Sequence, residues 1–490
     1  MAEVSSSTLG TPLVQNQEFD AETSRLGFGR VNDVIEEAKK QLWLAGPLIA
    51  VSLLQCSLQI TSVMFVGHLG ELALSGASLA SSFASVTGFD ILLGMASALE
   101  TLCGQAYGAK QYHMLGVHMQ RGMLTLLAMS IPLALIWFYT STILIALGQD
   151  HEICKEAGNF NRWMIPGLFA YSLLQCLIRF LQTQNNVFPM MISSGITAFL
   201  HIIVCWALIF KLGLGSKGAA LAISISNWVN LLLLASYVMI SPDCKSTWTG
   251  FSKEALHDIS SFIKLAIPSA IMICFEYWTF EMVVLLSGLL PNPKLETSVL
   301  SISLNTCWMV YMVSVGLGSA ISTRVSNELG AGRPQSAQLA LQVMITMALS
   351  EGAAIAVATV LIRSVWGKLY SNENEVIRYV AEMMPLLALS DFLDGFQCVL
   401  SGAARGCGWQ NLCVYINLGA YYVVGIPSAV LFAFTLHIGG MGLWMGIICA
   451  LLVQVIALVT VNACTDWSQE AMKAADRVQN TTLVIEKTIA

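Results

Sequence analysis

The sequence contains twelve apolar runs, each long enough to cross a lipid bilayer, and this feature limits the fold more than any other. A bilayer core of about 30 Å requires about 20 apolar residues per helix. Because lipid offers no hydrogen bonds to an open backbone, such runs predict helices. We therefore expect an all-α membrane protein with twelve transmembrane helices, the third run being long enough for a helix plus a short extension. The runs lie near residues 42–66, 76–104, 117–147, 157–183, 188–211, 217–240, 264–289, 297–325, 336–362, 376–405, 411–434 and 440–464.

The composition agrees with a membrane protein and argues against several functional classes. Of the 490 residues, 56% are hydrophobic and only 11% are charged, against roughly 25% charged in soluble domains. The stretch GLGSKG at residues 213–218 lacks the ending of a nucleotide-binding loop, and the sequence has no HExxH metalloenzyme motif. The 13 cysteines are expected to act as small buried hydrophobes. We expect no enzyme activity, no metal, no use of ATP and no nucleic-acid partner.

Polar stretches divide the chain into two halves and two tails. Residues 241–263 form the longest polar insertion and predict a linker between a first half at 42–240 and a second half at 264–464. Most Lys and Arg residues fall on the side of this linker and of both termini, which predicts that this side is cytosolic. The tails at 1–41 and 465–490 are then cytosolic, and the end of the first tail, around residues 31–40, is a candidate for a short helix on the membrane surface.

The two halves show internal repetition. An offset of 221 residues places Pro47 on Pro268, and an offset of 219 places Pro166 on Pro385. Six helices per half mean that both repeats enter the membrane from the same side, as in transporters with parallel repeats. An offset of 222 superposes Gly94, Ser97, Ala98, Thr101, Gly108 and Ala109 on Gly316, Ser319, Ala320, Thr323, Gly330 and Ala331.

Two acids in the second half stand out against this repetition. Glu276 and Asp394 lie deep in apolar runs, and the offsets of 221 and 219 pair them with Gln55 and Gln175. A carboxylate at a helix centre costs about 2.5 to 3.5 kcal/mol on insertion scales, so such groups are usually functional. An amide keeps the hydrogen-bonding capacity of the acid but does not titrate. The contrast predicts that only the second half binds and releases protons at these positions.

Three motifs resemble a known family: LETLCGQAYGA at residues 99–109, RVSNELGAG at 324–332 and ARGCGWQ at 404–410. With twelve helices in two halves, they are similar to the plant branch of the multidrug and toxic compound extrusion (MATE) family, the detoxification-type carriers. The resemblance covers roughly residues 36 to 465. It implies the MATE fold of two pseudo-symmetric six-helix lobes and the export of organic solutes in exchange for protons, by alternating access of the lobes.

The resemblance also implies roles for individual residues. Paired acids on the seventh and tenth helices form the proton site of this branch, and Glu276 and Asp394 occupy those positions. Many prokaryotic relatives use an acid on the first helix, where this chain has Gln55, Gln59 and Thr61. A proton or sodium mechanism in the first lobe is therefore not expected.

Other polar and aromatic residues are weaker candidates, because polar groups inside helical bundles are often only interhelical contacts. Asp90, Glu100 and Glu351 are single acids for which we expect gating or packing roles. The candidates to support the acid pair are Asp391, Asn305, Gln397 and Tyr311. The candidates to line a cleft are Gln55, Gln175, Trp278, Trp308 and Met272.

The sequence thus favours a proton-coupled exporter of organic solutes, such as xenobiotics or secondary metabolites, with H+ as coupling ion and no bound cofactor. We expect a monomer in the plasma or vacuolar membrane. Two alternatives stay open. A flippase for lipids or amphiphiles would use the same architecture, and an uncoupled, channel-like or regulatory membrane protein would use the same helices without exchange.

Overall fold

Membrane-length helices make up almost all of the structure. The computed structural model describes the backbone of residues 13–489 and the side chains of residues 31–480, and this part of the chain contains no strand. Twelve of its helical segments are long and apolar enough to span a membrane, which confirms the predicted number. They are Val31–Gly67, Glu71–Gly108, Tyr112–Phe138, His151–Thr183, Phe188–Lys211, Ser216–Ile240, Ile259–Ser287, Pro293–Gly330, Pro334–Leu369, Asn374–Cys407, Gln410–Thr435 and Gly440–Cys464.

Several spans consist of more than one helical element. The third run contains α4 and, as expected, a short extension, α5; the first-half elements are α1 (Leu13–Gly67), α2 (Glu71–Ala84), η1 (Ser85–Phe89), α3 (Asp90–Gly108), α4 (Tyr112–Phe138), α5 (Thr140–Ala146), α6 (His151–Thr183), α7 (Phe188–Trp206), η2 (Ala207–Lys211) and α8 (Ser216–Ile240). The second half comprises α9 (Ile259–Ser287), α10 (Pro293–Gly330), α11 (Pro334–Trp366), η5 (Gly367–Leu369), α12 (Asn374–Cys407), α13 (Gln410–Asn417), η6 (Leu418–Gly425), α14 (Ile426–Val430), η7 (Leu431–Thr435) and α15 (Gly440–Cys464).

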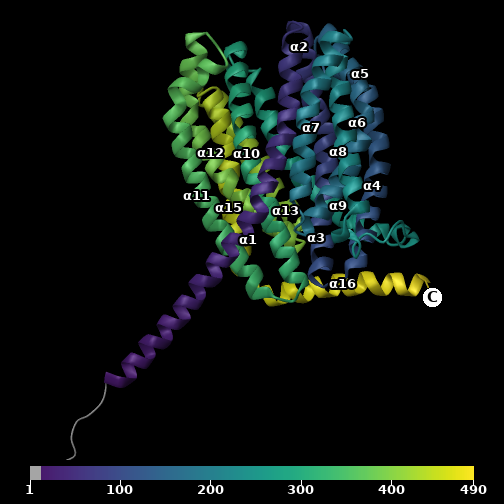
Figure 1. Ribbon diagram of the computed structural model, residues 1–490. Coiled ribbons are helices and arrows are strands. Elements are labelled where there is room, and N and C mark those ends of the chain that lie inside the picture. The colour runs from purple at the N-terminus through teal and green to yellow at the C-terminus, as the bar shows by residue number, and fades with distance from the viewer. Residues whose placement is uncertain (1–12, 490) are drawn as a thin grey trace, which may run out of the picture.

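The N-terminal tail differs from the expected surface helix. Residues 31–40 continue directly into the first span as part of α1, which leaves the bundle at its N-terminal end (Figure 1). The reason is a set of buried polar contacts: Arg324 on α10 donates from Nε and Nη2 to the Glu37 carboxylate at 2.9 and 2.8 Å. Gln41 donates to the Ala340 carbonyl oxygen of α11 at 2.7 Å. These contacts fix the segment against the second half.

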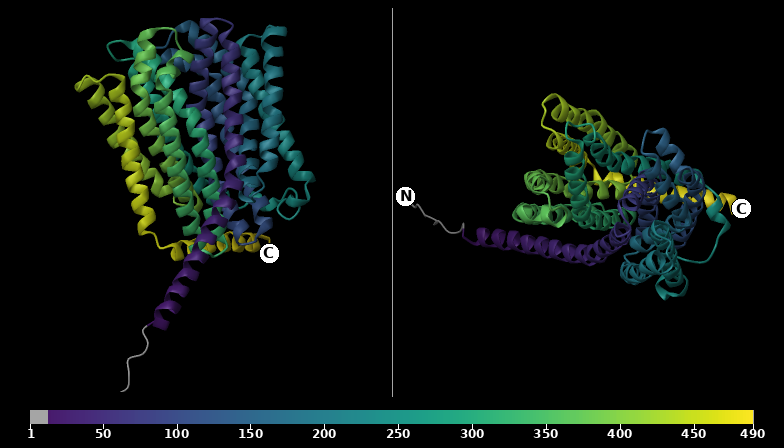
Figure 2. Two further views of the ribbon diagram at one scale, coloured as in Figure 1. Left: turned by 60° about the vertical axis from the view of Figure 1, so that its left-hand side comes forward. Right: turned by 90° about the horizontal axis from the view of Figure 1, so that it is seen from above.

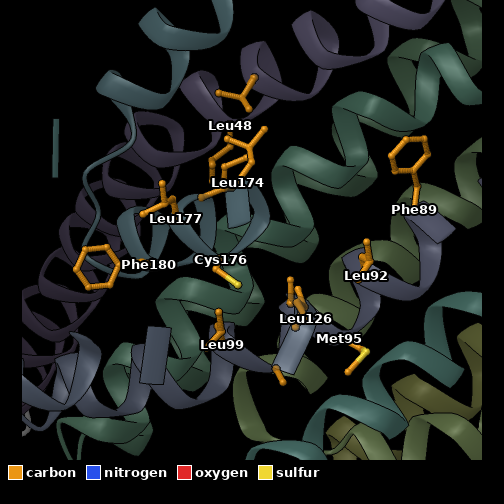
Figure 3. Close-up of a cluster of buried hydrophobic side chains, with 14 of the residues drawn as sticks. Leu48, Phe89, Leu92, Met95, Leu99, Leu126, Leu174, Cys176, Leu177 and Phe180 are labelled. Atoms are coloured by element: carbon orange, nitrogen blue, oxygen red, sulfur yellow. The ribbon is translucent and has the colours of Figure 1, made fainter. Parts of the chain in front are cut away.

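The first half is built around an apolar core shared by α1, η1, α3, α4 and α6. Figure 3 shows side chains of these elements converging, among them Leu48, Phe89, Leu126 and Phe180. Leu126 and Phe180 are fully buried. Because burying one such side chain contributes about 1.5–3 kcal/mol, this core holds the helices of the half in fixed positions.

Glycines let helices of opposite halves approach closely, and they do so in repeat-related pairs. A β-carbon at Gly94 on α3 would lie 2.5 Å from Cα of Ala270 on α9. One at Gly316 on α10 would lie 2.8 Å from Cα of Ile49 on α1. At the ends of α3 and α10, β-carbons at Gly108 and Gly330 would meet backbone oxygens of the partner helix at 2.0 and 2.1 Å. The repeated glycines of the sequence are therefore contact points between the two halves.

Polar bonds join the halves next to these glycines. Gln105 on α3 donates to the Gly406 carbonyl oxygen at the end of α12, at 3.1 Å. Asn327, the repeat counterpart of Gln105, donates to the Thr183 carbonyl oxygen at the end of α6, also at 3.1 Å. The bonds have the same form in both directions, so this end of the bundle is held closed by a pseudo-symmetric set of contacts.

The C-terminal tail forms a helix, α16 (Trp467–Ile489), that lies across this closed end nearly perpendicular to the spans (Figures 1 and 2). It packs against α3, α10 and α11. Arg477 donates to Gln105 Oε1 of α3 and to the Cys407 carbonyl oxygen of α12, each at 2.9 Å. Burial lowers the pKa of Arg477 from its ordinary value, and the nearby Glu470 carboxylate partly offsets this. The helix therefore bridges the two halves, and we call this end of the bundle the α16 end.

The linker between the halves is docked on the first half. It spans residues 241–258, with short turns η3 (Pro242–Cys244) and η4 (Lys253–Leu256), because α9 already begins at Ile259. Gln120 on α4 donates to the Gly250 carbonyl oxygen and accepts from the Ser252 N–H, each at 2.9 Å. These bonds hold the linker in place against α4 of the first half.

Adding a single methyl group tests the close approach of α3 and α10 at the α16 end. We expect Gly330→Ala to destabilise the protein by about 1–3 kcal/mol, because the added atom overlaps the Gln105 backbone of α3. Gly419→Ala is the matched control, since no atom lies within 4 Å of its β-carbon position. Thermal unfolding in detergent should show a lower midpoint for Gly330→Ala alone. Equal midpoints for both variants would contradict the predicted contact.

Candidate functional site

The two predicted acids come together in the second half and share an amide. Glu276 lies on α9, and Asp394 and Gln397 lie one turn apart on α12. Gln397 Nε2 donates to Glu276 Oε1 at 2.8 Å and to Asp394 Oδ1 at 3.0 Å. Tyr311 on α10 donates its hydroxyl to the same Glu276 oxygen at 2.9 Å. All three helices of this network therefore meet at one carboxylate.

Both acids are almost fully withdrawn from solvent. The exposed fraction is 5% for Glu276 and 8% for Asp394, and Gln397 is fully buried. The other end of the Gln397 amide accepts from the Ser401 hydroxyl at 2.9 Å. This bond fixes the orientation of the amide, so its NH2 group must face the two acids.

A cavity with an aromatic wall adjoins the acids. The space in it that the centre of a water molecule can occupy is about 20 Å3, enough for about one or two waters in this conformation. Tyr277 and Trp308 meet edge to face at 5.0 Å between ring centroids, and Trp308 and Tyr311 do so at 5.9 Å. The lining residues are Glu276, Tyr277, Phe280, Leu304, Cys307, Trp308, Tyr311 and Asp394. Such a cavity combines an apolar surface with two convergent acids, as small-molecule sites do.

Only some of the supporting candidates contact the two acids in the structure. Tyr311 and Gln397 contact the acids, as the sequence suggested. Asp391 is buried one turn from Asp394, and its Oδ2 has no hydrogen-bond partner. Asn305 is exposed and makes no described hydrogen bond to either acid. The role of Asn305 as a hydrogen-bond partner of the acids therefore stays a prediction.

The candidates for cleft lining also divide. Trp308 lines the cavity. Met272 does not, since it is buried in the core, where its carbonyl oxygen accepts from Asn417 of α13 at 2.8 Å. Trp278 donates to the Val86 carbonyl oxygen of η1 at 3.1 Å and so connects the two halves. Gln55 and Gln175 lie in the first half and do not line this cavity.

Sequence reasoning missed Tyr277, Phe280, Leu304 and Cys307 as lining residues. Cys307 and Trp308 are neighbours in sequence, and Leu304 is one helical turn before Trp308. The spacing of three and four residues around Trp308 is a signal that could have found one of them. Tyr277 directly follows Glu276, so on an ideal helix it points about 100° away, and the sequence gives no signal that both residues line one cavity.

A buried ionic triad joins the halves between this site and the α16 end. Glu100 on α3 accepts from Arg179 on α6 at 2.8 Å and from Arg405 on α12 at 3.1 Å. Glu100 is 1% exposed. Arg179 belongs to the first half and Arg405 to the second, so one carboxylate is held by both. A packing or gating role, as expected for Glu100, fits this geometry.

Comparison with known proteins agrees with the fold and the repeat. The MatE family model matches two segments of the chain, residues 47–207 and 268–431. Protein DETOXIFICATION 16 of Arabidopsis thaliana is 60% identical over 456 residues, covering 93% of this chain and 94% of that protein. Protein DETOXIFICATION 17 of the same plant is 58% identical over 445 residues, covering 91% and 94%.

Solved structures show the same architecture. The crystal structure of the eukaryotic MATE transporter AtDTX14 superposes with a TM-score of 0.88 at 47% identity, covering 91% of this chain and all of that chain. An outward-facing multidrug resistance MATE transporter shares the fold alone, with a TM-score of 0.75 at 17% identity over 91% of this chain and 97% of that one.

Fold and site together define a polytopic membrane transporter of two repeated halves. The chain belongs to the MATE family, in agreement with the resemblance of its motifs. Its similarity to the plant DETOXIFICATION proteins extends over nearly the whole length of both chains.

The ionic triad can be tested by a substitution that removes the charge of Glu100 and keeps the size of its side chain. Glu100→Gln leaves Arg179 and Arg405 buried without their acid, so we expect a loss of about 3–5 kcal/mol in the free energy of unfolding. Glu382→Gln is the matched control. It removes the acid from an exposed pair with Arg378, and such pairs contribute about 0–1 kcal/mol. Unfolding of both variants in detergent, followed by helix content, gives the comparison. A Glu100→Gln protein as stable as Glu382→Gln would rule out a structural triad.

Proposed function

We propose that this chain exports organic solutes in exchange for protons, with Glu276 and Asp394 as the coupling acids. One observation carries the proposal. The Gln397 amide holds the two acids of α9 and α12 together at an aromatic cavity, whereas their repeat counterparts, Gln55 and Gln175, do not titrate. At these two repeat-related positions, the titratable groups are thus confined to the second half.

The hydrogen bonds of Glu276 suggest how a proton could act on the helices. Its Oε1 accepts from both Tyr311 and Gln397, an arrangement suited to a carboxylate. A protonated carboxyl becomes a donor at one oxygen. The Gln397 NH2 group cannot accept that bond, and the Tyr311 hydroxyl can accept it only by turning and giving up its own donation to Glu276. Protonation therefore changes the contacts that hold α9 against α10 and α12. A conformational change follows when the two states of the protein bind the proton with different affinity.

The cavity supports exchange between proton and solute. Its acids and its aromatic surface lie side by side, so a solute that binds when the cavity widens contacts the groups that bind the proton. A solute held by the rings of Tyr277 and Trp308 displaces water around the acids. This alters how readily they ionise, because desolvation disfavours the charged form. Competition of this kind lets a proton entering from one side release a solute.

The driving force is sufficient for accumulation. One proton contributes about 1.4 kcal/mol for each pH unit across the membrane and about 2.3 kcal/mol for each 100 mV. We propose that the α16 end faces the cytosol, which the Lys and Arg asymmetry of the sequence supports. Export then moves solute away from the cytosol, across either the plasma or the vacuolar membrane.

Isosteric substitution tests the coupling acids. Glu276→Gln and Asp394→Asn keep the size of each side chain and copy the amide chemistry of the first half, so folding and insertion should be retained. We expect pH-driven transport of a fluorescent planar cation, ethidium, and of an anionic flavonoid conjugate to fall to background in proteoliposomes. Proton movement, followed by an entrapped pH dye, should be lost with it. Glu382→Gln, which changes an exposed acid on α12, serves as the control.

Three outcomes would contradict the proposal. Either variant could accumulate solute at the wild-type rate, which would exclude its acid from coupling. The wild type could move solute with no accompanying proton flux, which would indicate an uncoupled pathway. It could instead move labelled lipid between leaflets and neither solute, which would indicate a flippase.

A further inference from the structure

We propose that Glu351 and Asp391 form a second proton-binding pair in the second half, distinct from Glu276 and Asp394. The inference rests on the proposed function for its role in transport, but the pair is defined by its own geometry. Glu351 lies at the middle of α11, and Asp391 lies on α12. Neither residue lines the cavity.

Both carboxyl groups have a buried oxygen without a partner. Asp391 is 8% exposed, and its Oδ2 makes no hydrogen bond; Glu351 Oε1 is likewise buried and unpaired. An unsatisfied buried acceptor costs about 1–3 kcal/mol. A protonated carboxyl gains a donor, which a neighbouring carboxylate oxygen or a water can accept. A proton held by the pair therefore supplies the missing partner.

Close packing of α11 on α12 brings the acids together. A β-carbon at Gly395 on α12 would lie 3.6 Å from Glu351 Oε2, and one at Gly352 on α11 would lie 3.0 Å from the Phe392 ring. The small residues leave room for the Glu351 side chain to turn toward α12. Glu351 Oε2 therefore lies against Gly395, one turn after Asp391 on α12, and a proton shared there would remove the repulsion between two like charges.

The surroundings offer protons but no cation. The titratable groups that face the pair are Asp394 on α12 and Cys307 on α10, whose thiol contacts Asp391. On α15, the Trp444 indole bonds to Ser390 rather than to either acid. No described ion pair includes Glu351 or Asp391, whereas the deeply buried Glu100 has two arginines. Charge at this pair is therefore balanced by protonation and not by a counter-ion.

The repeat supports a function beyond packing. The offset of 219 that aligns Pro166 with Pro385 also places Asp391 on Ser172. Ser172 is fully buried and donates to the Phe169 carbonyl oxygen of its own helix at 2.8 Å. The first half thus fills this position with a group that does not titrate. The contrast is the same as that between Glu276 and Gln55.

The position of the pair suggests that a proton bound there is not displaced by a solute in the cavity. Cys307 contacts Asp391 and also lines the cavity, and Asp394 is one turn away on α12. Protons can therefore pass between the cavity and the pair, while the pair itself stays behind the cavity wall. A proton bound there would be carried in addition to the one that competes with solute.

Infrared difference spectroscopy tests the site without any solute. The purified protein in lipid is titrated with acid, and the carboxylic C=O stretching region is recorded. We expect a wild-type band that is lost in both Glu351→Gln and Asp391→Asn but kept in Glu276→Gln and in Glu382→Gln. If the two single variants keep every wild-type band, the second pair does not bind a proton. Glu351→Ser and Asp391→Ser, the second of which introduces the residue of the first half, serve as alternatives should an amide disturb folding.

Coupling ratios then test its role in transport. At zero voltage and a difference of one pH unit, each coupled proton raises the limiting ethidium gradient tenfold. We expect Glu351→Gln and Asp391→Asn to transport with a tenfold lower limiting gradient than wild type, whereas Glu276→Gln does not accumulate ethidium. A wild type that couples, with unchanged gradients in both variants, would refute the second pair and leave the proposed function intact. A wild type without coupling would refute the proposed function itself, while the infrared result would still decide the site.

Discussion

A carboxylate buried between membrane helices must be neutralised by a cation or by a proton. Which of these neutralises a given acid decides whether that acid holds helices together or can change its charge. Glu37, Glu100 and Glu328 have arginine partners. Their charges are balanced permanently, so they fasten helices together near the α16 end. Glu276, Asp394, Asp391 and Glu351 have no such partner among the described ion pairs. In a medium of low dielectric, the unpaired acids are the ones whose charge can change.

The glycine contacts explain how a symmetric scaffold holds asymmetric chemistry. Gly108 and Gly330 bring α3 and α10 together through backbone atoms, so the closure of the bundle requires no particular side chain from either half. Polar bonds of the same form run in both directions between the halves. Because the closure is shared equally, the side chains deeper in each half are free to differ, and the acids of one half can stand where the other has amides and a serine.

Much of this arrangement could be predicted from the sequence, but not the facing of individual side chains. The twelve spans, the repeat and the acid pair follow from hydropathy, from spacing and from the cost of charge in lipid. Asn305 and Met272 do not line the described cavity, and the sequence could not predict this because a uniformly apolar helix carries no signal of which face meets which neighbour. Met272 lies one turn before Glu276, yet α13 covers it. The helix α16 was missed for a related reason: its polar residues resemble a tail until the closed end supplies a surface for Trp467 and Ala474.

The bridge made by α16 has a practical consequence for work with this protein. Arg477 donates to both α3 and α12, so the end of the chain is a working part of the closed bundle and not an inert appendage. A bulky group attached directly to α16 would act on a helix that contacts both halves, and a flexible spacer would keep that force away from the closed end.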